Sequence, residues 1–259
     1  MSYIFSSIAI SLICIYSSFA FSYTVLIDPG HGGDDEGASY QIVKKINGKT
    51  FITPIYEKDL ALQLSKKIYN ILRKKNYNAY LTRSFDRTVD LNERAEMAEK
   101  LKADLFVSIH VNSSFSRRSK GFETYYLDNH KDAVVRKVEE VENRNLKGEE
   151  LIIQQIITDL IVEKTTKSSK KLARYIHKSL QGFIVKKFKV KDRGVKPGLF
   201  FVLALAKRPA VLLEVGFLSN PKEVNKLMDH KFQSAYAISV VKGIERYAKE
   251  AIKSGPALF

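Results

Sequence analysis

Cysteine is almost missing from this sequence, and its scarcity restricts the chemistry open to the protein. The single cysteine, Cys14, lies within the first 21 residues. If that segment is removed, the remaining chain can form neither a disulfide bond nor a thiolate site. Any metal ion that it binds must therefore be held by histidine, aspartate and glutamate side chains.

Tryptophan is absent too, and acidic residues are scarce relative to basic ones. The chain has 28 Asp and Glu against 43 Lys and Arg, a formal net charge of +15. Such a surplus favours an anionic partner, of which nucleic acid, a membrane surface and a cell-wall polymer are candidates. The lysines are scattered, however, and no aromatic-basic strand or Cys-His finger typical of nucleic-acid binding occurs. We therefore predict a generally basic surface and no nucleic-acid partner.

Charged residues are missing from Ile4 to Phe21, and the stretch from Ile8 to Tyr16 is strongly apolar. Small residues follow at Ser18 and Ala20, which is typical of a signal-peptide cleavage site, although no Lys or Arg precedes the apolar core. The alternative, a retained membrane anchor, is disfavoured because the core is shorter than the ~20 residues that a span needs. We predict a signal peptide at 1–22, export to the periplasm or the cell exterior, and no membrane span after cleavage.

Strand-like and helix-like segments alternate through the rest of the chain, which favours an α/β fold with a largely parallel sheet. We predict a single catalytic domain over 23–259, built as a three-layer, mostly parallel central sheet flanked by helices. The expected strands are 25–27, 77–82, 104–110, 122–127, 199–206 and 210–215, and the expected helices begin near 57, 91, 168, 221 and 235.

Two histidines and two glutamates occupy corresponding places in this pattern. His31, His110 and Glu214 lie at or near strand ends, and Glu57 opens a helix. Because ligands bind beyond the carboxyl ends of parallel strands, we expect all four side chains at one edge of the sheet. Two imidazoles and one carboxylate, with water in the fourth position, are the ligands of a catalytic zinc ion, and a remaining carboxylate suits a general base.

Each of these residues also has a simpler explanation. A strand-end histidine is often a surface residue, and a glutamate in the first turn of a helix is stabilised by the helix dipole. The glycines around His31, at positions 30, 32 and 33, are expected to allow a tight turn and to leave space around the imidazole. The convergence of four residues on one edge favours the metal site.

Several separate motifs in this order resemble one family. They are Val25–Gly33 (VLIDPGHGG), Tyr56–Leu60 (YEKDL), Leu81–Arg83, Leu91–Arg94, Ser108–Asn112 (SIHVN), Arg193–Val195 and Leu213–Asn220 (LEVGFLSN). Together they resemble the zinc-dependent N-acetylmuramoyl-L-alanine amidases of the Amidase_3 type, over nearly all of the chain after residue 22. The resemblance implies zinc bound by His31, Glu57 and His110, Glu214 as the catalytic carboxylate, and hydrolysis of the amide between N-acetylmuramic acid and L-alanine in peptidoglycan. Asn112 and Arg83 are candidates for substrate contacts or for local loop-holding bonds.

Residues 129–167 are predicted to form a helical insertion between the 122–127 strand and the 168–187 helix. Division-type members of the family carry a helical insertion here that covers the zinc site until a partner protein displaces it. By that resemblance, the segment is a lid with Glu139, Glu140 or Glu142 reaching the metal, and an activator protein acts on it. The alternative is a helical hairpin that merely packs on the domain.

Two further functions remain open from the sequence. One is a wall-binding protein that has lost catalysis, which is disfavoured because all four site residues are present. The other is a zinc peptidase that cuts the stem peptide, a close chemical neighbour of the amidase.

Overall fold

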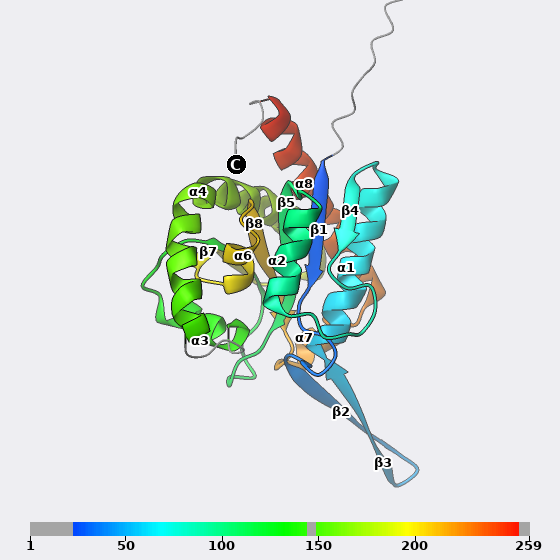
Figure 1. Ribbon diagram of the computed structural model, residues 1–259. Coiled ribbons are helices and arrows are strands. Elements are labelled where there is room, and N and C mark those ends of the chain that lie inside the picture. Colours follow the sequence, from blue (N-terminus) through cyan, green and yellow to red (C-terminus); the bar gives the residue numbers. More distant parts are fainter. Residues whose placement is uncertain (1–22, 144–148, 254–259) are drawn as a thin grey trace, which may run out of the picture.

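A six-stranded sheet forms the centre of the protein (Figure 1). The structure is a computed structural model that describes residues 23–143 and 149–253. The strands are β1 (Thr24–Pro29), β4 (Asn78–Leu81), β5 (Leu105–Asn112), β6 (Phe122–Leu127), β7 (Asp192–Gly198) and β8 (Ala210–Phe217), in the spatial order β4-β1-β5-β8-β6-β7. Strand β6 runs antiparallel to β8, and the other neighbouring pairs are parallel.

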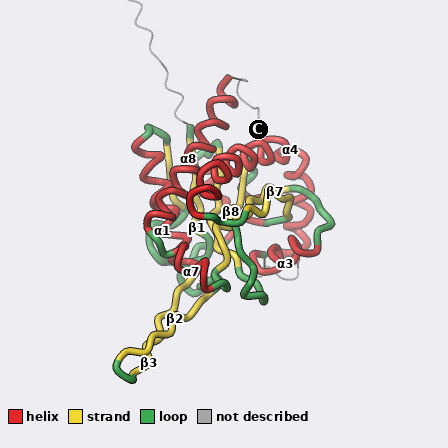
Figure 2. Tube along the Cα trace, turned by 180° about the vertical axis from the view of Figure 1, so that it is seen from behind, coloured by secondary structure: helices red, strands yellow, loops and turns green. Residues whose placement is uncertain are grey.

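Helices cover both faces of this sheet, which confirms the predicted three-layer architecture (Figure 2). On one face, α1 (Glu57–Lys74), α8 (His230–Lys253) and the second half of α4 (Glu149–Leu180) share a core with alternate sheet residues such as Val107 and Leu213. On the other face, α2 (Leu91–Lys100) and the short α6 (Phe201–Leu205) pack on residues such as Phe106 and Leu212. The strands are buried on both sides, as expected for a parallel sheet between helix layers.

Two predicted helix starts are confirmed by their caps. The Asp90 side chain accepts a hydrogen bond from the Glu93 backbone N–H at 2.7 Å and caps α2. Asn220 accepts from the Lys222 N–H at 2.9 Å and caps α7 (Pro221–Leu227), with Pro221 in the first turn. These side chains satisfy backbone donors that have no partner within the helix.

The prediction of a strand over 199–206 is wrong. The strand in this region is β7, which ends at Gly198, and the apolar run that follows forms α6. All five α6 residues are buried, and a short, continuously apolar run does not distinguish a buried strand from a buried helical turn.

A two-stranded hairpin that the sequence analysis did not predict extends away from the body (Figures 1 and 2). It consists of β2 (Ser39–Ile46) and β3 (Lys49–Tyr56), paired antiparallel. Its base packs on the core through Tyr40, Ile42 and Ile55. Beyond the base, both faces are exposed, so the apolar and polar side chains do not alternate in the way that reveals a half-buried strand.

The predicted insertion contains α3 (Ala133–Glu142) and the first part of α4. Helix α4 continues past residue 167, where the insertion was expected to end, and reaches Leu180 without a break. It is followed by a π-helical turn (Gln181–Val185) and the short α5 (Lys186–Phe188). The predicted insertion is therefore continuous with the part of α4 that packs against α8.

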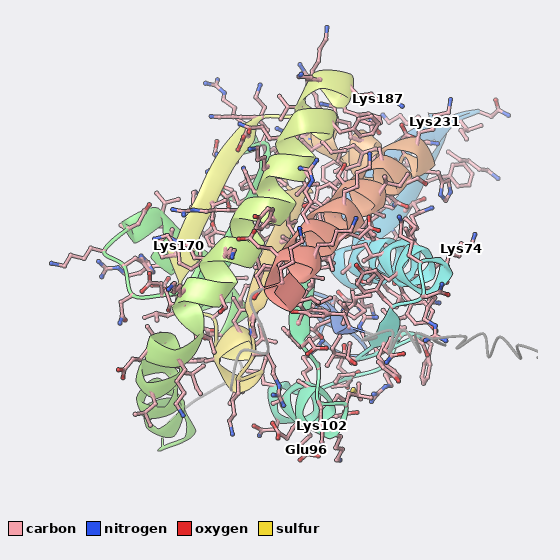
Figure 3. All side chains as sticks on the ribbon, turned by 90° about the horizontal axis from the view of Figure 1, so that it is seen from above. Lys74, Glu96, Lys102, Lys170, Lys187 and Lys231 are labelled. Atoms are coloured by element: carbon pink, nitrogen blue, oxygen red, sulfur yellow. The ribbon has the colours of Figure 1, made fainter. Side chains whose placement is uncertain are left out.

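Positive charge is distributed over many elements. Figure 3 labels lysines on α1, α4, α5 and α8 and directly after α2. Within the described ranges, the structure contains no helix that is both long and apolar enough for a transmembrane segment.

Candidate metal centre

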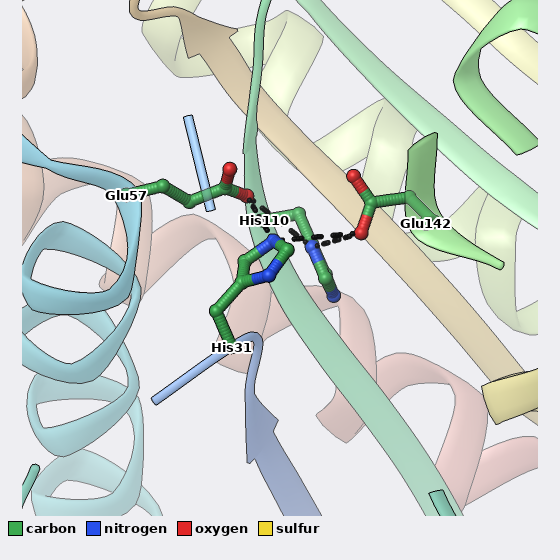
Figure 4. A group of neighbouring side chains, drawn as sticks. All are labelled: His31, Glu57, His110 and Glu142. Atoms are coloured by element: carbon green, nitrogen blue, oxygen red, sulfur yellow. Dashed lines mark ion pairs between the residues drawn. The ribbon is translucent and has the colours of Figure 1, made fainter. Parts of the chain in front are cut away.

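Four side chains meet at the carboxyl edge of the sheet (Figure 4). His31 follows β1, Glu57 begins α1, His110 lies near the end of β5, and Glu142 ends α3. One nitrogen or oxygen atom from each lies within 4.8 Å of the corresponding atoms of the others. The structure thus brings together the three residues expected to bind metal and adds a carboxylate from the insertion.

The direction of His31 is fixed by its backbone and by a neighbouring aspartate. Its φ angle is 57°, a left-handed conformation that is unusual for a residue with a side chain. Its Nδ1 is 2.8 Å from Asp35 Oδ2, so Nε2 is the nitrogen that faces the cluster. Asp35 is not among the residues predicted from the sequence, because nothing in a short polar loop indicates which carboxylate reaches the imidazole.

Glu57 is held by two backbone N–H groups. Its Oε1 accepts a hydrogen bond from Val111 N–H, and its Oε2 accepts one from Ala38 N–H, both at 2.8 Å. Oε1 also lies 3.1 Å from His31 Nε2 and 3.3 Å from His110 Nδ1. The start of α1 therefore delivers a buried carboxylate with a fixed orientation to both imidazoles.

The glycines near His31 do not leave open space, contrary to the prediction from the sequence. A Cβ atom on Gly30 would lie 2.4 Å from the His110 ring, so the ring fills the place that a side chain would take. Gly32 and Gly33 lie equally close to the 83–88 segment. The glycines allow the two imidazoles to pack edge to face, with their centroids 4.9 Å apart.

The geometry of the cluster fits a divalent cation. His31 Nε2 and His110 Nδ1 are buried, and neither makes a hydrogen bond within the described part of the chain, although carboxylate oxygens lie within 3.5 Å. The ligand atoms of His31, Glu57, His110 and Glu142 lie within 4.8 Å of one another, close enough for one ion to contact all four. Two imidazoles with carboxylates are a typical donor set for zinc.

The protonation of the imidazoles without a metal supports the same conclusion. Burial lowers the pKa of His31, but the Glu57 charge and the Asp35 hydrogen bond outweigh it and raise the pKa to about 10. Burial also lowers the pKa of His110, but the nearby Glu142 and Glu57 carboxylates outweigh it and raise that pKa to about 10. The site therefore favours positive charge, whether it comes from protons or from a bound cation.

Glu214, the predicted catalytic carboxylate, lies beside this cluster on β8. It is paired in register with His110 on one neighbouring strand and with Glu123 on the other. It is 0 % exposed, and no described group hydrogen-bonds to either carboxylate oxygen. Burial, and then the charges of Glu142, Glu57 and Glu123, raise its pKa well above the ordinary value for glutamate. A carboxyl group of raised pKa suits general acid–base work.

Of the three acidic residues considered for the insertion, Glu142 is the one that enters the cluster. Its Oε2 lies 2.9 Å from His110 Nδ1 and 3.5 Å from His31 Nε2. Glu139 instead accepts hydrogen bonds from the Leu199 N–H and pairs with His130, and Glu140 is exposed.

The residue that follows α3, Asn143, holds the C-terminal end of this helix in place. The Asn143 side chain donates to the Leu199 carbonyl at 2.8 Å and accepts from the Phe201 N–H at 3.0 Å. A cavity of about 420 Å³ remains beside the cluster, with Val141 and Glu142 of α3 in its lining together with His31 and His110.

The two tentative contact residues are both buried in networks. Asn112 donates from Nδ2 to Glu123 Oε2 at 3.2 Å. Arg83 donates to the backbone carbonyls of Pro29, Gly30 and Lys58, so it holds the His31 loop. The remaining histidines, His130, His177 and His230, take no part in the cluster.

Comparisons with known proteins identify the family and support the fold. The sequence profile described as N-acetylmuramoyl-L-alanine amidase matches residues 25–246. The amidase AmiA of Escherichia coli (strain K12) is 32% identical over 232 residues, which cover 86% of this chain and 75% of AmiA. The crystal structure of N-acetylmuramoyl-L-alanine amidase from Clostridium difficile 630 superimposes with a TM-score of 0.65 at 32% identity, over 88% of this chain and 97% of that one. The CwlD amidase from Clostridioides difficile, solved in complex with the GerS lipoprotein, gives a TM-score of 0.64 at 25% identity, over 88% and 99%.

Proposed function

Since this chain belongs to the N-acetylmuramoyl-L-alanine amidase family, a family of peptidoglycan amidases, we propose that it hydrolyses an amide bond of peptidoglycan with a zinc ion and with a glutamate as the general base. The bond cleaved joins the lactyl group of N-acetylmuramic acid to L-alanine. His31, Glu57 and His110 are the proposed zinc ligands, and Glu214 is the proposed base. The convergence of His31 Nε2 and His110 Nδ1 on Glu57 Oε1, at 3.1 and 3.3 Å, carries this proposal.

The protein's own residues account for the remaining steps. Zinc, when bound, supplies a Lewis acid that polarises the scissile carbonyl and lowers the pKa of water. Asp35 orients His31, and the Val111 and Ala38 N–H groups orient Glu57. The Glu214 carboxylate takes a proton from the attacking water and passes it to the nitrogen of the leaving L-alanine.

Product analysis on a defined muropeptide tests the reaction. We expect release of an intact stem peptide with a free L-alanine amine, loss of activity after chelation, and recovery on adding zinc. Glu214→Gln is expected to lower kcat by about 10²- to 10⁴-fold, the usual contribution of a general acid–base group. Elemental analysis of the same variant is expected to show unchanged zinc, because Glu214 is not among the proposed ligands.

Two results would contradict the proposal. Shortened stem peptides would identify a peptidase, and zinc-independent hydrolysis would exclude the metal mechanism. His31→Ala serves as the opposite control, since it is expected to lose both zinc and activity. A wall-binding protein without catalysis would bind peptidoglycan and release no product in any of these assays.

We also propose that α3 acts as an inhibitory lid over this site. Glu142 lines the cavity and lies 2.9 Å from His110 Nδ1, so its carboxylate would be available as a fourth ligand to a zinc ion held by the cluster. A carboxylate in that position excludes the water that the reaction needs. The Asn143 bonds to 199–201 hold the helix in place, so a partner protein that displaces α3 would activate the enzyme.

Export completes the proposed function. Peptidoglycan lies outside the cytoplasmic membrane, so the enzyme must leave the cytoplasm to meet it. The predicted signal peptide at 1–22 lies outside the described residues, and we propose that it directs the chain to the periplasm or the cell wall. Edman sequencing of the protein recovered from the envelope fraction tests this: a new N-terminus between Phe21 and Tyr23 is expected, and an intact Met1 would contradict cleavage.

A further inference from the structure

A second charged cluster lies on the same sheet edge as the candidate metal centre, two strands beyond it. Glu123 of β6 is aligned with Glu214 of β8, which is aligned with His110 of β5. Neighbouring strands are about 4.8 Å apart, which places the Glu123 backbone roughly 10 Å from that of His110. Arg193 and Lys196 of β7 reach Glu123 from the next strand.

Glu123 has no capacity for further hydrogen bonds. Its Oε1 accepts from Arg193 Nε and from Lys196 Nζ, the latter at 2.8 Å. Its Oε2 accepts from the Tyr125 hydroxyl at 2.7 Å and from Asn112 at 3.2 Å. The carboxylate is 1 % exposed, and although burial alone would raise its pKa, Lys196 and Arg193 hold it below the ordinary value.

The two cations, in contrast, have unused donors. Only Nε of the Arg193 guanidinium bonds to Glu123, and its two terminal nitrogens make no hydrogen bond to any described residue. The Arg193 and Lys196 side chains are 22 % and 20 % exposed, respectively. Arg193 lies over the Phe217 ring at 5.0 Å, and Lys196 is 5.9 Å from the centre of the Tyr125 ring, so both are held in place.

The charge balance distinguishes a binding site from a structural ion pair. One cation is enough to neutralise one buried carboxylate, but two cations, Arg193 and Lys196, pair with the single carboxylate of Glu123. Arg193, Lys196 and Glu123 together therefore carry one net positive charge, and the two cations are partly exposed at the same sheet edge as the candidate metal centre. A planar guanidinium with free terminal nitrogens is suited to a second, bidentate carboxylate.

From this arrangement we propose that Arg193 and Lys196 form a subsite for a carboxylate of the stem peptide, on the leaving-group side of the scissile amide. The inference rests on the proposed function. An extended peptide advances about 3.5 Å per residue, so the second or third residue after the scissile bond lies about 7–10 Å away, near Glu123 of β6, where the Arg193 and Lys196 side chains reach back from β7. The subsite would make the enzyme prefer free-acid stem peptides over amidated ones.

A pair of substrates tests the subsite. The first is N-acetylmuramoyl-L-alanyl-D-glutamate, and the second carries the α-carboxamide in place of the α-carboxylate of the second residue. We expect the wild-type chain to prefer the acid, and Arg193→Gln to lose about 10- to 100-fold in kcat/KM on the acid and less than about threefold on the amide. Lys196→Gln is expected to show the same pattern with a smaller loss, and Arg193→Lys to recover part of it.

Comparison of the two substrates separates binding from folding. Damage to the Glu123 network would lower kcat/KM equally on both, and that result would overturn the inference. Arg208→Gln is the matched control, because Arg208 also pairs with one glutamate but precedes β8, at the opposite end of the sheet. It is expected to leave the substrate preference unchanged.

Failure of the subsite and failure of the proposed function give different results. Every variant is assayed both alone and with Glu142→Ala, so that a closed lid is not mistaken for a missing activity. If neither form cleaves either substrate at the lactyl amide, the proposed function fails. If both substrates are cleaved at equal rates, the proposed amidase function is supported and the proposed carboxylate subsite is wrong.

Discussion

At the scale of single residues, Arg83 connects two of the proposed metal ligands. Its guanidinium is buried and donates to the carbonyls of Pro29 and Gly30, beside His31, and to that of Lys58, beside Glu57, at 2.8–3.1 Å. A lysine at this position keeps the charge but cannot reproduce the planar set of donors. We expect Arg83→Lys to weaken zinc binding by about 10- to 100-fold, the usual effect of losing a group that orients ligands.

Competition with a chromophoric chelator measures this affinity, and the melting temperature of the metal-free protein reports any loss of folding. Arg87→Lys is the control, since Arg87 lies in the same loop but bonds to Thr82 and Glu93 rather than to the ligand segments. Equal zinc affinity in the wild type and Arg83→Lys would contradict a positioning role. So would an equal loss in both variants.

The sequence predicts some residues of the site and not others, for a physical reason. His31, Glu57 and His110 are recognisable because each lies where a regular element begins or ends. Asp35 and Glu123 act through contacts made by folding, with His31 in a loop and with β7 across the sheet. No local pattern in the sequence specifies such contacts.

At the scale of elements, α3 is expected to decide whether the site is open. Removing the carboxylate that lies 2.9 Å from His110 is expected to raise the rate on peptidoglycan. For Glu142→Ala we expect the rate to increase at least about tenfold. A tenfold change corresponds to destabilising the closed position of α3 by ~1.4 kcal/mol relative to the open one. Dye release from labelled sacculi measures this rate.

Glu140→Ala provides the matched comparison, because Glu140 lies on the same helix but is exposed. It is expected to behave like the wild type. An unchanged or lower rate for Glu142→Ala would contradict the lid, and would favour a helical hairpin that only packs on the domain. Deletion of 130–166 is a less direct test, because α4 is continuous across residue 167 and its second half belongs to the core.

Element prediction succeeded where the pattern was periodic or capped, and failed elsewhere. The start of α2 at Asp90 and that of α7 at Asn220 follow from side-chain caps that act locally. The 199–206 segment and the β2–β3 hairpin do not show a distinct period, since the first is apolar throughout and the second is exposed on both faces. Their structures depend on how neighbouring elements pack around them.

At the scale of the whole molecule, stability depends on a buried ion pair that joins four segments. Asp28, at the end of β1, pairs with Arg94 of α2 and accepts hydrogen bonds from Thr82 and Ser108, each at 2.7 Å. Burial alone would raise the pKa of Asp28, but Arg94, Thr82 and Ser108 outweigh it and lower the pKa below 3.8. The charged form of Asp28 therefore stabilises the fold.

The sign of the pH dependence follows from this shift. Because the folded pKa is below the unfolded one, the stabilisation is complete above pH 3.8 and is lost as the pH falls through the folded value.

Asp28→Asn leaves Arg94 buried without its counter-charge, which we expect to cost about 3 kcal/mol at pH 7. The difference between wild type and variant should shrink below pH 3.8, because the unfolded wild-type chain then binds a proton at this aspartate that the folded protein does not, and it should level off once the folded Asp28 is protonated as well. Urea unfolding at pH 7, 5 and 3, with a chelator present to remove any metal contribution, measures the difference.

Asp59→Asn, an exposed position on α1, is the control and is expected to leave the stability unchanged at all three pH values. A wild-type advantage over Asp28→Asn that is the same at pH 3 and pH 7 would show that Asp28 stabilises the fold by its shape rather than by its charge.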